Sequence, residues 1–144
     1  MKNKRITTIF IFSLIGLLFS GYLSFTKLFT GACPLTEGCP YFLGYPSCYY
    51  GFILFLILFV LAILLLKNEK LVLMKKVFYV SLIGIIFAAY SSIKELLYPN
   101  CLNGICNYTL LVPTCIYGLI FYIVIFVTSL IHLKKNSLTK LKVE

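Results

Sequence analysis

The sequence predicts an all-α membrane protein, in which four transmembrane helices form a bundle built from two tandem two-helix repeats. Of its 144 residues, 61% are hydrophobic and only 12% are charged, a composition outside the range of ordinary soluble domains. Four apolar stretches are long enough for the roughly 20 helical residues that a hydrocarbon core requires. We therefore expect one transmembrane domain over residues 1–144. The expected spans are residues 6–29, 47–66, 74–96 and 111–133.

The distribution of basic residues predicts how the chain lies in the membrane. Of the 13 lysines and arginines, 11 precede the first span, join the second to the third, or follow the fourth. The positive-inside rule then places both termini and the basic tail, residues 134–144, in the cytoplasm. The formal charge of +9 is thus expected to orient a multi-pass plasma membrane protein, not to bind nucleic acid.

The second half of the chain resembles the first. Residues 14–33 and 82–101 are identical at eight of 20 aligned positions, and residues 39–60 and 106–127 at ten of 22. Because each unit contains two helices, both copies are expected to cross the membrane in the same direction, related by a pseudo-two-fold axis along its normal. The first span, as counterpart of the third, is expected to be a helix of the mature protein, not a signal peptide. The predicted repeats are residues 6–66 and 74–133.

The six cysteines form two related triplets, and all of them are predicted on the extracytoplasmic side. An outward-facing cysteine meets an oxidising environment, which favours disulfides. A thiol oxidase needs at least a loop pair that reaches a partner and a second pair at the membrane, because each transfer proceeds through a mixed disulfide. Small structural loops are the alternative. The triplets are Cys33, Cys39 and Cys48, then Cys101, Cys106 and Cys115.

Cys48 and Cys115 share the pattern Pro-Ser/Thr-Cys-x-Tyr-Gly. In this pattern the Ser47 or Thr114 hydroxyl can cap a helix that begins at the cysteine. The N–H groups at such a helix end and the helix dipole stabilise a thiolate, whereas burial in lipid opposes it.

Two glycines lie three residues after these cysteines, on the same helix face. Gly51 and Gly118 leave space beside each sulfur for a neighbouring helix or a flat ligand. Phe52, Phe55, Leu119 and Tyr122 extend the face. An apolar slot with sulfur at its mouth suits a quinone ring, so we predict Gly51, Phe55, Gly118 and Tyr122 as the quinone-binding residues.

Pairings without catalysis are also compatible with the sequence. Cys48 and Cys115 can form one structural disulfide between the second and fourth spans, or Cys39 can pair with Cys48 and Cys106 with Cys115. Four thiolates could hold zinc, but no histidine lies on the predicted outer side and CxxC spacing is missing. No metal site is predicted.

The segment IGLLFSGYLSFTK, followed by Cys33-x5-Cys39 and GYPSCYYGFILFL, resembles the first half of the vitamin K epoxide reductase family. The resemblance implies a four-helix bundle that takes electrons from a partner protein through a loop cysteine pair and passes them to a second pair beside a quinone. It assigns the shuttle role to Cys33 and Cys39. Where the family has CxxC, this chain has Cys101-x4-Cys106 and then Cys115.

These observations predict a membrane thiol–disulfide oxidoreductase that passes electrons from an extracytoplasmic thioredoxin-like protein to a lipid quinone. Cys33 and Cys39 would shuttle electrons, while Cys106 and Cys115, with Cys48, would form the membrane centre. The alternatives are a non-enzymatic, disulfide-stapled membrane protein and a thiol-based metal carrier.

Overall fold

The computed structural model describes residues 2–30, 41–42, 44–97 and 114–141. These residues form four long helices and one small hairpin, and all four helices are long and apolar enough to cross a membrane. The prediction of an all-helical protein with four membrane-spanning helices is confirmed. The helices are α1 (Lys2–Thr30), α2 (Ser47–Lys67), α3 (Leu71–Leu97) and α4 (Thr114–Leu141).

The described helices do not coincide everywhere with the predicted spans. The fourth helix is described from Thr114, and the predicted residues 111–113 lie outside the described residues. It then continues to Leu141 through most of the segment predicted as a basic tail. The length of the apolar stretch determines how much of a helix can lie in lipid, but the helix can continue into water beyond that stretch.

The segment before α2 contains a short hairpin that was not predicted from the sequence. Strands β1 (Tyr41–Phe42) and β2 (Tyr45–Pro46) pair antiparallel. Gly44 lies in the turn with a φ of +85°, a backbone conformation that glycine adopts without steric cost. The hairpin leads directly into the first residue of α2, and so fixes the direction from which the chain enters that helix.

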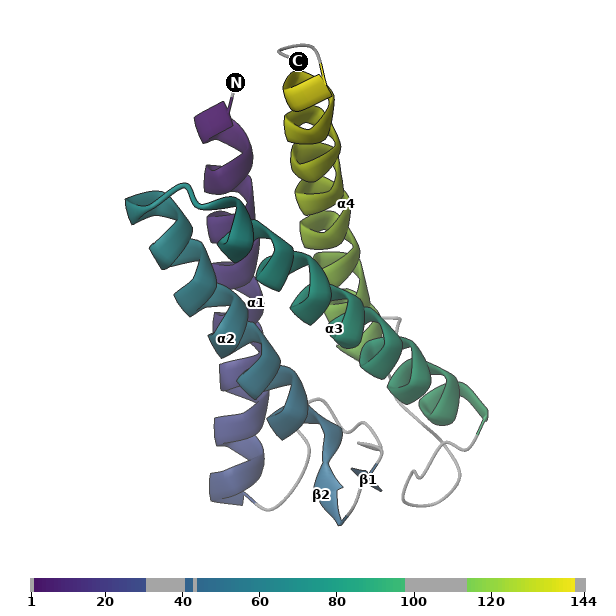
Figure 1. Cartoon of the computed structure of the whole chain (residues 1–144). Coiled ribbons are helices and arrows are strands. Elements are labelled where there is room, and N and C mark those ends of the chain that lie inside the picture. The colour runs from purple at the N-terminus through teal and green to yellow at the C-terminus, as the bar shows by residue number, and fades with distance from the viewer. Residues whose placement is uncertain (1, 31–40, 43, 98–113, 142–144) are drawn as a thin grey trace.

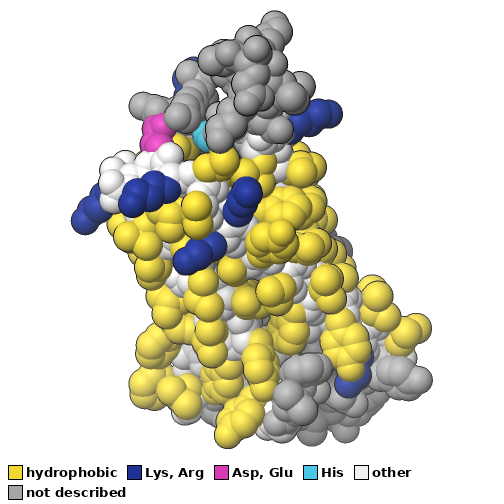
Figure 2. Space-filling model, in the orientation of Figure 1, with side chains coloured by type: hydrophobic (Ala, Val, Ile, Leu, Met, Phe, Trp, Pro, Cys, Tyr) yellow, Lys and Arg dark blue, Asp and Glu magenta, His cyan; other side chains and the backbone are white. Residues whose placement is uncertain are grey.

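The helices pack in a ring, with α1 against α2, α3 against α4, and closing contacts of α1 with α4 and of α2 with α3. Both termini and the α2–α3 connection lie at one end, and the hairpin lies at the other (Figure 1). On the face shown in Figure 2, most basic side chains gather toward the terminal end, beside a broad hydrophobic surface. Such a surface matches a lipid environment.

Several contacts occur twice, at positions 67 or 68 residues apart. Ser13 and Ser81, both fully buried, each donate a hydrogen bond of 2.9 Å to the carbonyl three residues earlier. The rings of Phe10 and Phe59 stack at 5.5 Å, and those of Phe78 and Phe126 at 4.8 Å. Corresponding residues therefore make corresponding contacts in the two halves of the chain.

The centre of the bundle is an aromatic stack between α2 and α4. The rings of Phe55 and Tyr122 lie 4.3 Å apart at 13°, and each residue is only 2% exposed. Gly16 of α1 lies against Phe55, and Gly84 of α3 lies against Tyr122, so closely that an added Cβ would overlap the ring. The two glycines thus let the outer helices approach the stack, the usual role of small residues between membrane helices.

Candidate functional site

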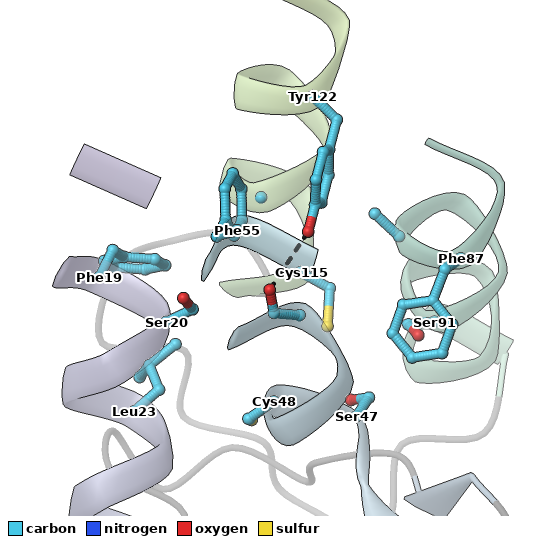
Figure 3. Close-up of a pocket in the computed structure, with 13 residues that line it drawn as sticks. Phe19, Ser20, Leu23, Ser47, Cys48, Phe55, Phe87, Ser91, Cys115 and Tyr122 are labelled. Carbon is cyan, nitrogen blue, oxygen red and sulfur yellow. Dashed lines mark hydrogen bonds between the residues drawn. The ribbon is translucent and has the colours of Figure 1, made fainter. Parts of the chain in front are cut away.

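A cavity of about 60 Å³ lies between the four helices, on the hairpin side of the Phe55–Tyr122 stack. Each helix contributes part of its wall (Figure 3). All lining residues except Ser47 fall into pairs that are 67 or 68 positions apart. The pairs are Phe19 and Phe87, Ser20 and Ala88, Leu23 and Ser91, Cys48 and Cys115, Gly51 and Gly118, and Phe55 and Tyr122.

The structure brings six of the ten predicted site residues to this one cavity. Cys48, Gly51 and Phe55 come from α2, and Cys115, Gly118 and Tyr122 from α4. In each helix they occupy one face because positions i, i+3 and i+7 project in nearly the same direction. Four predicted cysteines fall outside the described residues: Cys33, Cys39, Cys101 and Cys106.

The two cysteines at the cavity each occupy the second residue of their helix, so the N-terminal ends of α2 and α4 meet there. Both side chains are half-buried, and no disulfide joins Cys48 to Cys115. Figure 3 shows the Cys115 sulfur directed toward the space between the start of α2 and α3. Two thiols from different helices thus share one small, largely apolar enclosure.

The two predicted glycines leave open space instead of admitting a neighbouring helix. A Cβ built on Gly51 or on Gly118 would meet no atom of the described residues within 4 Å. This contrasts with Gly16 and Gly84, which touch aromatic rings. The described helices therefore do not pack against Gly51 and Gly118 as they do against Gly16 and Gly84.

A hydroxyl links the two central helices at the upper edge of the cavity. Tyr122 donates a hydrogen bond of 3.3 Å to the carbonyl oxygen of Gly51, as the dashed line in Figure 3 marks. The corresponding position on α2 is Phe55, which has no hydroxyl. This bond holds the Tyr122 ring in place against Phe55 and closes the cavity on the side of the bundle centre.

The predicted cap at the start of α2 does not form with described residues. Ser47 is the first residue of the helix and is 4% exposed, but its hydroxyl has no hydrogen-bond partner in the described part of the chain. The side chain lines the cavity instead of turning back to the helix N–H groups. The corresponding Thr114 side chain lies outside the described residues.

Sequence reasoning missed the walls that α1 and α3 contribute. Phe19 contacts Tyr117 at a ring distance of 6.2 Å, and its counterpart Phe87 contacts Tyr50 at 5.6 Å. Phe19 and Phe87 are identical, aligned positions of the two halves, so the repeat did contain a signal for them. Ser20 and Ser91 carry no such signal, because they align with Ala88 and Leu23.

Another enclosed space among the described residues lies at the opposite end of the bundle and is smaller, about 30 Å³. Glu69, Lys70 and the buried His132 line it together with apolar side chains. Among the described residues, no group of three or more histidine, cysteine and acidic side chains is arranged to hold a metal ion. The thiol-bearing cavity is therefore the candidate site.

Comparisons with known proteins give no match: no family model, no curated protein and no solved structure is similar to this chain.

Proposed function

We propose that this chain is a membrane thiol–disulfide oxidoreductase of the plasma membrane, which passes electrons from an extracytoplasmic thioredoxin-like protein to a lipid quinone. The observation that supports this proposal most directly is the shared cavity. Cys48 and Cys115 reach it from two helix N-termini, with an aromatic stack as its inner wall. Two thiols next to an apolar space fit a transfer of electrons from sulfur to an apolar ring compound.

We also propose that the chain consists of two tandem two-helix repeats. The contacts that recur in its two halves support this proposal. The paired serines, the paired aromatic contacts and the paired walls of the cavity are the contacts that a pseudo-two-fold axis through the Phe55–Tyr122 stack would produce. Such an axis places Cys48 and Cys115 at equivalent positions on either side of one space. With both termini cytoplasmic, the cavity and the cysteine-bearing loops lie at the extracytoplasmic side.

In the overall reaction, two thiols of the partner become one disulfide, and a bound quinone would accept the two electrons and two protons. Cys33 and Cys39 exchange disulfides with the partner, and the electrons then reach the membrane cysteines through a mixed disulfide. Cys48 and Cys115 are the membrane pair that the cavity favours. Cys101 and Cys106, the counterparts of Cys33 and Cys39, belong to the second triplet and would connect the loop to that pair.

The cavity fits a quinone ring in character, and its volume must increase for the ring to enter. Its wall is mainly apolar, with space beside Gly51 and Gly118 that no described atom fills. A volume of about 60 Å³ is below the ~150 Å³ of an apolar cavity known to hold benzene. Phe19 and Phe87 are only half-buried, so we propose that their rings rotate to enlarge the cavity when quinone binds.

A thiol-tagging experiment tests the proposed function. Purified full-length protein is reduced with a mild dithiol, incubated with or without ubiquinone-1, and treated with a maleimide that adds mass to each free thiol. We expect rapid reduction of at least one disulfide and loss of two tags per reoxidised pair only when quinone is present. If all six cysteines resist mild reduction, the chain is a disulfide-stapled protein and not an oxidase.

Filling the cavity from the Gly51 side tests the location of the quinone. Gly51→Leu places an isobutyl group where the structure has open space, so we expect quinone-dependent reoxidation to fall about tenfold or more while the protein still folds. The corresponding Gly118→Leu should act in the same way. Ile53→Leu, on the lipid-facing side of α2, is the matched control and should leave the rate unchanged. Unchanged rates in both glycine variants would place the quinone elsewhere.

A further inference from the structure

Ser47 differs from the other buried serines whose hydrogen bonds the structure shows. Six of these donate to a backbone carbonyl: five to a residue three or four positions earlier in the same helix, and Ser24 to Cys48 of α2. Ser47 is the first residue of α2, so no preceding helical turn offers it a carbonyl oxygen. The residue is 4% exposed, and its buried hydroxyl has no hydrogen-bond partner among the described residues.

A buried hydroxyl without a partner costs free energy, and most such groups in proteins bind another group or water. The Ser47 side chain lines the cavity between Cys48 and the α3 wall. Three further hydroxyls line the cavity: that of Tyr122 donates to Gly51, that of Ser20 donates to Gly16, and that of Ser91 belongs to the α3 wall. Ser47 is thus a hydrogen-bond donor available at the thiol end of an otherwise mainly apolar space.

We propose that Ser47 donates a hydrogen bond to a carbonyl oxygen of the bound quinone and thereby positions the ring beside Cys48 and Cys115. This inference rests on the proposed function for the identity of the ligand and adds the residue that orients it. A quinone ring offers an oxygen acceptor on an apolar, flat body, which matches a buried donor without a described partner beside a wall that is mainly apolar. Ser47 is a positioning residue, and the sulfur chemistry belongs to the cysteines.

The test measures binding of ubiquinone-1 to the fully oxidised, full-length protein by equilibrium dialysis, so that no turnover occurs. We expect Ser47→Ala to weaken binding about 3- to 10-fold, the loss of one neutral hydrogen bond. Ser47→Thr keeps the hydroxyl and should restore most of the affinity. Ser92→Ala is the control, because it removes a buried hydroxyl that is bonded to Ala88 and lies outside the cavity wall.

Two further measurements distinguish a positioning role of Ser47 from a structural one. With ¹³C-labelled ubiquinone-1, difference infrared spectra should show a carbonyl band lowered in frequency in the wild type and shifted back toward the free value in Ser47→Ala. The ligand-free Ser47→Ala protein should melt no lower than the wild type, since the mutation removes an unsatisfied buried group. A lowered melting temperature with unchanged quinone affinity would show a structural role and overturn the inference.

The outcomes also separate this inference from the proposed function. If the wild type binds and reduces ubiquinone-1 and Ser47→Ala does so equally well, with an unshifted carbonyl band, only the role of Ser47 is overturned. If the wild type binds ubiquinone-1 but its thiols are never reoxidised, the oxidoreductase proposal fails. The binding role of Ser47 is then retained if Ser47→Ala binds ubiquinone-1 more weakly than the wild type, and overturned if the two affinities are equal. If the wild type binds no ubiquinone-1, both fail.

Discussion

Replacing Cys115 by alanine is expected to reduce quinone-dependent thiol oxidation to the background rate. The cavity places Cys115 and Cys48 in one enclosure at the start of α4 and α2. Without one of these thiols, a disulfide between them cannot form, and electrons from the loop cysteines have no route to the quinone. Cys48→Ala should have the same effect. The measurement is the steady-state reduction of ubiquinone-1 with a reduced thioredoxin-like protein as donor.

Folding and binding controls make this result specific. Cys115→Ser changes little in volume, so its melting temperature and its affinity for ubiquinone-1 should stay close to those of the wild type while turnover is lost. In at least one of the two single variants, the remaining thiol should accumulate as a mixed disulfide, visible as a shift on a non-reducing gel. Turnover that survives both alanine variants would assign the membrane centre to other cysteines and leave Cys48 and Cys115 a structural role.

The second large effect concerns the glycines that contact the aromatic stack. Gly84→Ala is expected to destabilise the protein by about 1–3 kcal/mol, the usual range for forcing an extra methyl group into a packed core. The added carbon would overlap the ring of Tyr122, which is 2% exposed, stacked on Phe55 and held by its hydrogen bond to Gly51. The measurement is thermal unfolding of the purified protein in detergent.

The chain supplies matched controls for this prediction. Gly118→Ala adds the same methyl group where no described atom lies within 4 Å, so it should leave the stability unchanged or raise it by up to about 1 kcal/mol, because alanine is the better helix former. A smaller partner ring should relieve the overlap, so Gly84→Ala with Tyr122→Leu should lose less stability than the sum of the two single changes. Equal effects of Gly84→Ala and Gly118→Ala would contradict the packing described here.

The equivalent pair in the other half provides an independent repeat of the experiment. The methyl group added by Gly16→Ala would overlap the ring of Phe55, just as that of Gly84→Ala would overlap the ring of Tyr122. Gly51, like Gly118, has no described atom within 4 Å of an added Cβ. If the two halves are related by a pseudo-two-fold axis, Gly16→Ala should also be strongly destabilising and Gly51→Ala neutral or stabilising. A large effect in one half alone would show that the halves differ in how tightly they pack.

Much of the candidate site was predictable from the sequence because helical periodicity is a local property. Cys48, Gly51 and Phe55 share a face of any helix that contains them, and the recurrence of this spacing in the second half predicted a corresponding face on α4. The four membrane-spanning helices were predictable for a similar reason, since only long apolar stretches can satisfy both the bilayer thickness and the backbone hydrogen bonds.

Other features depend on contacts between segments that are far apart in the sequence. The second helix is apolar on nearly all sides, so its composition gives no indication of which face turns inward. In the sequence, Gly16 and Gly84 are recognisable only as identical, aligned positions of the two halves. The structure identifies the rings of Phe55 and Tyr122 as the contacts that require these residues to be small. The same applies to Ser47, whose sequence context predicted a helix cap.

The sequence by itself determined the number of helices, their approximate spans, the repeat pattern and the cysteine-bearing faces, because length, hydropathy and helical period are set by neighbouring residues. Only the tertiary structure decided that the two faces meet across one cavity, that α1 and α3 complete its wall, and that the Ser47 hydroxyl is left for the cavity. The physical reason is that the relative rotation of packed helices follows from side-chain volumes on every helix at once, and no single segment contains that information.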